Sequence, residues 1–214
     1  TDTDEWENLG YLAGPEGVLF ANFRNPDLRK YTGKTLKEVA DDMGKHYADV
    51  AMDFVIQDGS RVGVVYFLMS EKNVKKQIKL PYMSFGSDAG SIAPEGRFLN
   101  SNPHPRAYGN FARLLGKYVR DEQVIPLESA VHKLTGLSAD KLKIKNRGYL
   151  KEGYFADVVI FNPSTIQDHA TFTEPHKLAT GVHHVWVNGE QVLKDGQHTG
   201  AMPGRVVRGP GYKK

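Results

Sequence analysis

The chain has 214 residues, of which 40% are hydrophobic, enough for one ordinary core or for a large part of a bigger one. Its 28 Lys and Arg exceed its 25 Asp and Glu by only three, and no basic block carries an aromatic stacking platform, so nucleic acid is not expected as a partner. No apolar run reaches the length of about 18 residues that spans a membrane, so a membrane is not expected either. The absence of cysteine excludes disulfides, thiolate nucleophiles and zinc sites of the Cys type within this stretch.

The first half of the chain alternates predicted strands and helices. Thr1–Asn8 is acidic and polar, unlike a signal peptide, and because the chain lacks an initial Met we expect sequence to be missing before it. The compartment stays open, with a soluble protein of a bacterial-type cytoplasm or periplasm as the expectation. In chain order, the patterns predict a strand at 18–23, helices at 35–44, 46–57 and 71–79, and strands at 61–69 and 82–85.

Two of these strands carry the prediction of fold class. The run RVGVVYFLM, Arg61–Met69, is continuously apolar and predicts a strand buried on both faces of a parallel sheet. Ser70 is expected to cap the next helix, and Tyr82–Phe85 follows as a second buried strand that ends in Gly86, Ser87 and Asp88. Strand, helix and strand in this order predict a βαβ unit.

Beyond Asp88 the sequence predicts a long loop and two helices. The loop has about twenty residues, and a loop of this length in a compact domain usually has a function such as binding. The first helix is expected at 110–120. The second is expected from Pro126 to Thr135 and ended by Gly136. Its inward face is predicted to hold Leu127, Ala130, Val131 and Leu134.

The tail after about Ser138 is mostly β. A strand is predicted at 156–161 and a hairpin at 185–193, where Asn188 and Gly189 favour a two-residue turn. The end of the chain, 208–214, reads as a loose arm.

Asp88 is the first candidate for chemistry, because it sits where a predicted buried strand ends and a long loop begins. In parallel α/β barrels that edge is the rim of the active site. A carboxylate there can ligate a metal, take a proton from a metal-bound water and return it to a leaving group. Between Ser87 and Ala89, however, Asp88 is also a common turn residue.

Arg106 is the second candidate, since its forked guanidinium suits a carboxylate held by two parallel hydrogen bonds. The alternative is a structural or surface arginine. The eight histidines form neither a His-x-His pair nor a His-Glu-x-x-His helix, so no metal cage is predicted within this stretch. His183 and His184 are adjacent in a strand and point to opposite faces. His104 is interpreted as structural or as a support for the site.

Several motifs together resemble a known family. Gly86-Ser87-Asp88, then His104-Pro105-Arg106, then Tyr108-Gly109-Asn110-Phe111 are similar to the D-aminoacylases, the N-acyl-D-amino-acid deacylases of the amidohydrolase superfamily. The tail agrees with that family over 148–163, 168–172 and 185–189, and upstream 31–34 and 69–71 also fit. Each piece alone is weak, but the joint spacing is specific and covers nearly the whole chain.

The resemblance implies a fold and an activity. Residues 1–137 would be the C-terminal portion of a (β/α)₈ TIM barrel, with RVGVVYFLM as its seventh strand and the strand before Asp88 as its eighth. Residues 138–214 would be the C-terminal segment of a small β-sandwich domain. The activity would be zinc-dependent hydrolysis of an N-acyl-D-amino acid, in which metal-bound water attacks the amide carbon. Because a barrel needs about 250 residues, this chain would be a fragment, with the remaining zinc ligands upstream of Thr1.

The resemblance also assigns roles. Asp88 would ligate or face zinc and act as general base and then general acid, Arg106 would hold the substrate α-carboxylate, and Ser87 and His104 would support the site. The isolated chain is expected to be inactive and to bind zinc weakly. Ala89 and Asn110 stand where the family commonly has Gly and Thr, which leaves open a different amide substrate.

A noncatalytic module is the alternative from another class. It would bind a partner, the missing N-terminal half or a second copy, through exposed strand edges.

Overall fold

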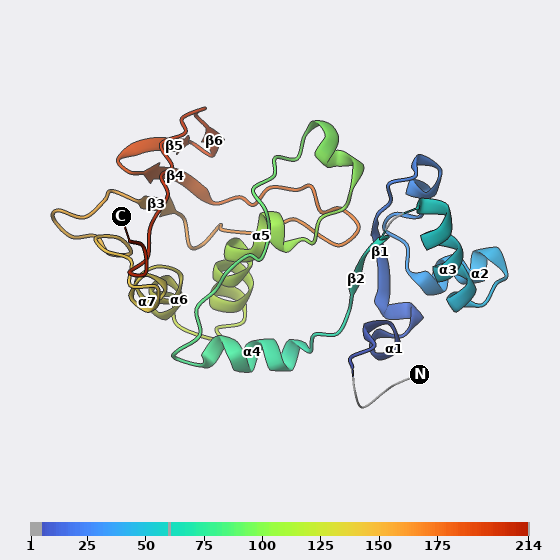
Figure 1. The fold of residues 1–214 in the computed structure, drawn as a ribbon. Helices are drawn as coiled ribbons and strands as arrows, with labels where there is room; N and C mark the ends of the chain where they lie inside the picture. The colour runs from blue at the N-terminus through green and yellow to red at the C-terminus, as the bar shows by residue number, and fades with distance from the viewer. Residues whose placement is uncertain (1–5, 60, 214) are drawn as a thin grey trace. The chain divides into compact units, whose positions relative to one another are not determined.

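The computed structural model describes residues 6–59 and 61–213 (Figure 1). The chain divides into two compact units, each a mixture of helices and strands, which confirms the predicted α/β class at that level. The first unit combines Thr1–Glu71, Ala89–Ala107 and Ala170–Lys177, and the second combines Lys72–Asp88, Tyr108–His169 and Leu178–Lys214. Each unit takes residues from both sides of position 138, and the division into a barrel part and a β domain there stays a prediction.

The predictions for the two ends of the chain fall partly on residues that the structure does not describe. Most of the acidic start, Thr1–Asn8, and the last residue of the chain, Lys214, lie outside the described residues. Among those described, no helix is both long and apolar enough to cross a bilayer.

The first unit is built on two antiparallel strands with helices packed beside them. Strand β1 (Val18–Asn22) pairs with β2 (Gly63–Tyr66), with Val18 opposite Tyr66 and Phe20 opposite Val64. The helical elements of this unit are α1 (Leu9–Ala13), η1 (Pro15–Gly17), η2 (Pro26–Tyr31), α2 (Leu36–Met43), α3 (Tyr47–Asp58) and η3 (Gly96–Asn100).

Helices α2 and α3 confirm the two helices predicted there. Thr35 caps α2 through a capping box with Glu38, in which each side chain binds the other's backbone N–H. Gly44 and Gly59 end α2 and α3 in the left-handed conformation, which glycine adopts without steric cost. Phe54 of α3 is 1% exposed and packs against the rings of Phe20, Phe23 and Tyr31, so these helices complete the aromatic core of the unit.

The prediction of a parallel strand buried on both faces at Arg61–Met69 is wrong for the described part of the chain. The strand is shorter, runs antiparallel to β1, and is only half-buried or exposed. The buried strand is β1, whose residues 18–21 are all buried. A run of apolar residues shows that a strand loses water, but its direction depends on which partner it meets.

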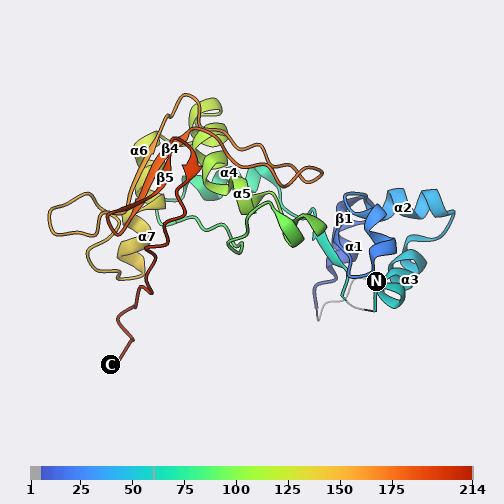
Figure 2. The same ribbon diagram turned by 90° about the horizontal axis from the view of Figure 1, so that it is seen from above.

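The second unit contains helices on one side of its core and a four-stranded antiparallel sheet on the other, which lies above the helices in Figure 1 and overlaps them in the view from above in Figure 2. Its helical elements are α4 (Glu71–Lys79), α5 (Arg106–Arg113), the π-helical segment η4 (Leu114–Asp121), α6 (Leu127–Leu134) and α7 (Gly136–Lys141), of which α4 and α5 begin in residues of the first unit. Its strands are β3 (Val158–Phe161), β4 (Val182–Val187), β5 (Glu190–Lys194) and β6 (Gln197–His198). Ile78, Ala112, Tyr118 and Ile166 lie in the core that joins the two sides.

The hairpin of β4 and β5 confirms the turn that the sequence predicted. Val187 pairs with Glu190, which leaves Asn188 and Gly189 as the two-residue connection. Their φ angles are 52° and 83°, so both central residues adopt the left-handed conformation that such a turn requires.

Two details of α6 and its end differ from expectation. Val131, predicted to face inward, is 37% exposed, whereas Lys133 is 5% exposed and belongs to the interior face with Ala130. Gly136 does not stop the helical region but opens α7, and Thr135 is the residue that ends α6. At Gly136 the chain lies so close to Tyr149 that an added Cβ would stand 2.6 Å from that ring, which explains a glycine there by packing.

Candidate active site

The segment before Ser87 and Asp88 is not a strand. Residues 83–88 have no ladder partner in the part of the chain that the structure describes, so the prediction of a buried strand at Tyr82–Phe85, and of a βαβ unit with it, is wrong there. A strand exists only where a neighbour accepts and donates its backbone hydrogen bonds. Met83, Ser84 and Phe85 are nevertheless half-buried, which accounts for the apolar pattern that suggested a strand.

Side chains take the place of a neighbouring strand along this segment. The buried Lys133 ammonium donates to the carbonyl oxygen of Leu80 and, at 3.2 Å, to that of Met83, and it lies over the Phe85 ring. Burial lowers the pKa of Lys133. At the other end, the Asn110 amide donates to the Gly86 carbonyl oxygen at 3.2 Å. The backbone that leads to Ser87 and Asp88 is therefore fastened to α6 and to α5.

Asp88 itself occupies an unusual backbone conformation. Its φ is 46°, in the left-handed region that few residues other than glycine adopt and in which Asp and Asn are enriched. Its side chain is exposed, while that of Ser87 is half-buried. This geometry suits both interpretations made from the sequence, a turn residue and a carboxylate presented at the end of an extended segment.

His104 and Arg106 lie in the first unit and interact directly. His104 Nδ1 accepts a hydrogen bond from the Arg106 backbone N–H at 3.1 Å, so the neutral ring carries its proton on Nε2. The ring packs edge-on against Phe172, with centroids 5.0 Å apart. Burial, and then the charge of Arg106, lower the pKa of His104. His104 thus orients the start of α5, while the Arg106 side chain is exposed.

The loop that ends at Arg106 is fastened to the first unit at several points. Asn102 donates its backbone N–H to the Ala21 carbonyl at 2.8 Å, and a nitrogen of the His176 ring lies 3.1 Å from the Phe98 carbonyl oxygen. The stretch Ala89–Ala107 of this unit begins directly after Asp88 and ends directly after Arg106. The predicted site residues therefore lie at the two ends of one loop.

Helix α5 is anchored on its second-unit side by Asp168. Arg113 Nη1 donates to Asp168 Oδ2 at 2.9 Å, and the Asp168 side chain is 7% exposed. A Cβ at Gly109 would lie 2.9 Å from the Asp168 Cβ, so glycine lets α5 approach this closely.

The described residues of this chain do not form a complete zinc site. Over 6–59 and 61–213, no three His, Asp or Glu side chains gather as a metal centre requires. Protein zinc sites use three or four such ligands, and Asp88 offers one carboxylate. Among these described residues Asp88 therefore belongs to no group of three such ligands.

The family of the chain follows from its match to known proteins. The model of the amidohydrolase family matches residues 80–193, which is more than half of the chain and includes Asp88, His104 and Arg106. The chain belongs to the amidohydrolase family. The resemblance to D-aminoacylases drawn from its motifs is confirmed by its relatives.

Three of those relatives show how far the likeness of this amidohydrolase chain extends. D-aminoacylase of Alcaligenes xylosoxydans xylosoxydans is 40% identical over 176 residues, which are 82% of this chain and 34% of that protein. A crystal structure of D-aminoacylase has a TM-score of 0.76 at 38% identity and covers 92% of this chain and 38% of its own. N-acyl-D-glutamate deacylase from Bordetella bronchiseptica, solved with zinc and a phosphonate inhibitor, has a TM-score of 0.73 at 31% identity, over 89% and 38% of the two chains. The chain spans about a third of the length of the curated relatives it matches.

Sequence reasoning did not find the residues that fasten the site. Lys133 had a signal, since it lies three positions after Ala130 and so on the same helical face, but a lysine was not considered for the interior. Asn110 and Asp168 carry no signal for their partners, because Gly86 and Arg113 lie 24 and 55 positions away from them in the sequence.

Proposed function

We propose that this chain is the C-terminal part of a metal-dependent amide hydrolase that converts N-acyl-D-amino acids to D-amino acids and carboxylates. One observation supports this most strongly, the 40% identity to a D-aminoacylase over 82% of the chain. We further propose the finer fold assignment, in which 1–137 complete a (β/α)₈ barrel and 138–214 complete a small β-sandwich domain.

Asp88 is proposed as the acid/base residue. Its carboxylate is exposed at the end of a fastened segment, where it can take a proton from the attacking water and deliver it to the amide nitrogen that leaves. The hydrogen bond from Asn110 to the Gly86 carbonyl limits the movement of the backbone that carries this carboxylate. This matters because a displacement of about 1 Å lowers the rate of an oriented reaction about 100-fold. Zinc, when bound by ligands from outside this chain together with Asp88, would polarise the amide carbonyl.

Arg106 is proposed to bind the substrate α-carboxylate. Its backbone is fixed by His104, and its exposed guanidinium can present two parallel N–H donors to a carboxylate. His104 supports Arg106 through the backbone, so we assign it a structural part in substrate binding, and Ser87 the same part beside Asp88.

The test uses the complete protein that contains this chain, assayed for release of D-amino acid from N-acetyl-D-amino acids. Asp88→Asn should lower kcat by about 100-fold or more, as expected for loss of a general base. Asp195→Asn is the matched control, since Asp195 is also exposed and also has a positive φ, of 48°; its rate should not change. Equal rates for Asp88→Asn and the unchanged protein would remove Asp88 from the mechanism, and no hydrolysis by the unchanged protein would reject the proposed activity.

A further inference from the structure

The second unit contains a pocket that none of the proposed catalytic residues uses. It has a volume of about 450 Å³ and is lined by residues of the stretches 143–155 and 205–212. Five cationic side chains are among its lining, at Lys143, Lys145, Arg147, Arg205 and Arg208. We call it the basic pocket. Its described lining includes no carboxylate, so its electrostatic character is that of an anion site.

Arg147 is fixed in position within the basic pocket. Its guanidinium donates to the Asp157 carboxylate and to the Asn188 side-chain oxygen, and it stacks over the Phe155 ring at 4.1 Å. The Arg147 side chain is 14% exposed. Guanidinium has five N–H donors in a rigid fork, and these two bonds set the direction of the others. An arginine held in this way loses little conformational entropy when it binds an anion.

The walls of the basic pocket are tied together by hydrogen bonds. Asn188, in the turn between β4 and β5, donates its side-chain amide to the Pro203 carbonyl at 2.7 Å and its backbone N–H to Asp157 at 2.8 Å. The chain is therefore attached to the sheet at Pro203, two residues before the lining stretch 205–212 begins. Within that stretch, Arg208 stacks over the Tyr212 ring at 3.8 Å. This contact lies within the arm predicted to be loose, whose described residues, 208–213, are all exposed.

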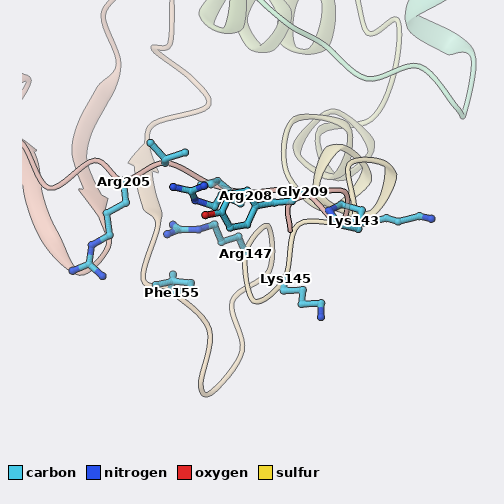
Figure 3. A pocket seen from close by; sticks show the side chains of 11 residues that line it. Lys143, Lys145, Arg147, Phe155, Arg205, Arg208 and Gly209 are labelled. Atoms are coloured by element: carbon cyan, nitrogen blue, oxygen red, sulfur yellow. The ribbon is translucent and has the colours of Figure 1, made fainter. Parts of the chain in front are cut away.

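The charges of the basic pocket surround its centre unevenly. Figure 3 shows Arg147 and Arg208 near its middle, with Arg205, Lys143 and Lys145 extending outward from its edge. Asp157 offsets one of the five positive charges through its bond to Arg147. The other cationic side chains repel one another, and an anion with several charged oxygens would relieve that repulsion.

We propose that the basic pocket binds a small molecule with two or more clustered anionic oxygens, of which a diphosphate group is the best match. Arginine forks pair with phosphate and carboxylate oxygens, and the flexible lysines at the edge can close on the outer charges. The volume falls in the range of about 300–1,000 Å³ usual for small-ligand pockets. This site does not depend on the proposed amide hydrolysis, because it shares no residue with Asp88, His104 or Arg106.

Inorganic pyrophosphate is the probe, added to the 214-residue chain at constant ionic strength and followed by calorimetry and amide NMR. We expect saturable binding of one pyrophosphate per chain, with shifts at Arg147, Phe155 and 206–209. ADP and citrate distinguish a nucleotide from a polycarboxylate as the better source of clustered oxygens, and acetate is the single-charge control. Binding of pyrophosphate no stronger than that of acetate, or shifts spread over exposed lysines throughout the chain, would overturn the proposal.

Arg208→Gln should weaken pyrophosphate binding about tenfold or more, as expected for loss of a charge-assisted contact. The matched control is Arg97→Gln, which removes an exposed arginine that stacks over Phe98 in the first unit, with 5.4 Å between guanidinium and ring centroid; its affinity should not change. Lys145→Gln, at an exposed position, provides a second variant that should fold normally and bind more weakly. Unchanged binding by both Arg208→Gln and Lys145→Gln, or equal weakening by Arg97→Gln, would refute the assignment.

Discussion

Gly116 is the position at which one added methyl group should most clearly disturb the second unit. A Cβ there would lie 2.7 Å from the carbonyl oxygen of Ile166. That oxygen already accepts a hydrogen bond from Arg120 Nη1 at 2.6 Å, so it cannot withdraw without stretching this bond. Overpacking costs about 1–3 kcal/mol, and weakening a bond from a charged donor adds about 1 kcal/mol. The better helix propensity of alanine offsets about 1 kcal/mol of this loss in the free energy of unfolding. The net expectation for Gly116→Ala is a loss of about 2 kcal/mol in the free energy of unfolding.

Urea unfolding followed by the fluorescence of Trp186, in a Trp6→Phe background that removes the other tryptophan, measures this, because Trp186 lies in β4 of the same unit. The matched control is Gly10→Ala in helix α1, where the nearest atom to the new Cβ is 3.6 Å away, so the substitution should be neutral or stabilise by up to about 1 kcal/mol. If Gly116→Ala unfolded at the same urea concentration as the unchanged chain, the tight contact between η4 and Ile166 would be refuted.

Two further outcomes test the first unit. Phe54→Ala should cost about 3–5 kcal/mol of stability, since Phe54 is 1% exposed in an aromatic core, whereas Ile56→Ala on the same helix, at 76% exposure, should change it by less than about 0.5 kcal/mol; similar losses in urea unfolding would contradict this core. The pKa of His104 is lowered from its ordinary 6.5, so the folded state binds fewer protons than the unfolded state. The contribution of His104 to the free energy of unfolding should therefore be complete above about pH 6.5 and should decline as the pH falls through the lowered pKa. NMR titration of the ring checks this, and a His104 pKa at or above 6.5 would contradict it.

Local signals in the sequence predicted local structure well. Asn188 and Gly189 supply two positive φ angles and hence a hairpin, and Thr35 with Glu38 supplies a helix start, because both depend on residues within a few positions. The direction of β2 and the absence of a ladder at 83–88 could not be predicted in this way. Strand pairing depends on which distant segments are at hand, and an apolar run records burial alone.

The candidate site shows the same division. Ser87, Asp88, His104 and Arg106 are candidates from motif spacing alone, and their roles stay predictions. The bonds that fasten the segment before Ser87 join Lys133 to Leu80 and Met83, about 50 positions apart, and no periodicity encodes such pairs. Sequence thus identified the candidate chemistry, while the supports of the backbone required coordinates.

The alternation of the two units along the chain limits how this protein can be taken apart. The polypeptide passes from one unit to the other after Glu71, Asp88, Ala107, His169 and Lys177. Cutting any single one of these five passages leaves four covalent bridges intact. A protease that nicks one exposed peptide bond would therefore release neither half, and only a truncation that passes Glu71 from the N-terminal side, or Leu178 from the C-terminal side, would remove residues from both. Engineers who want one half alone must splice three separate segments with new linkers.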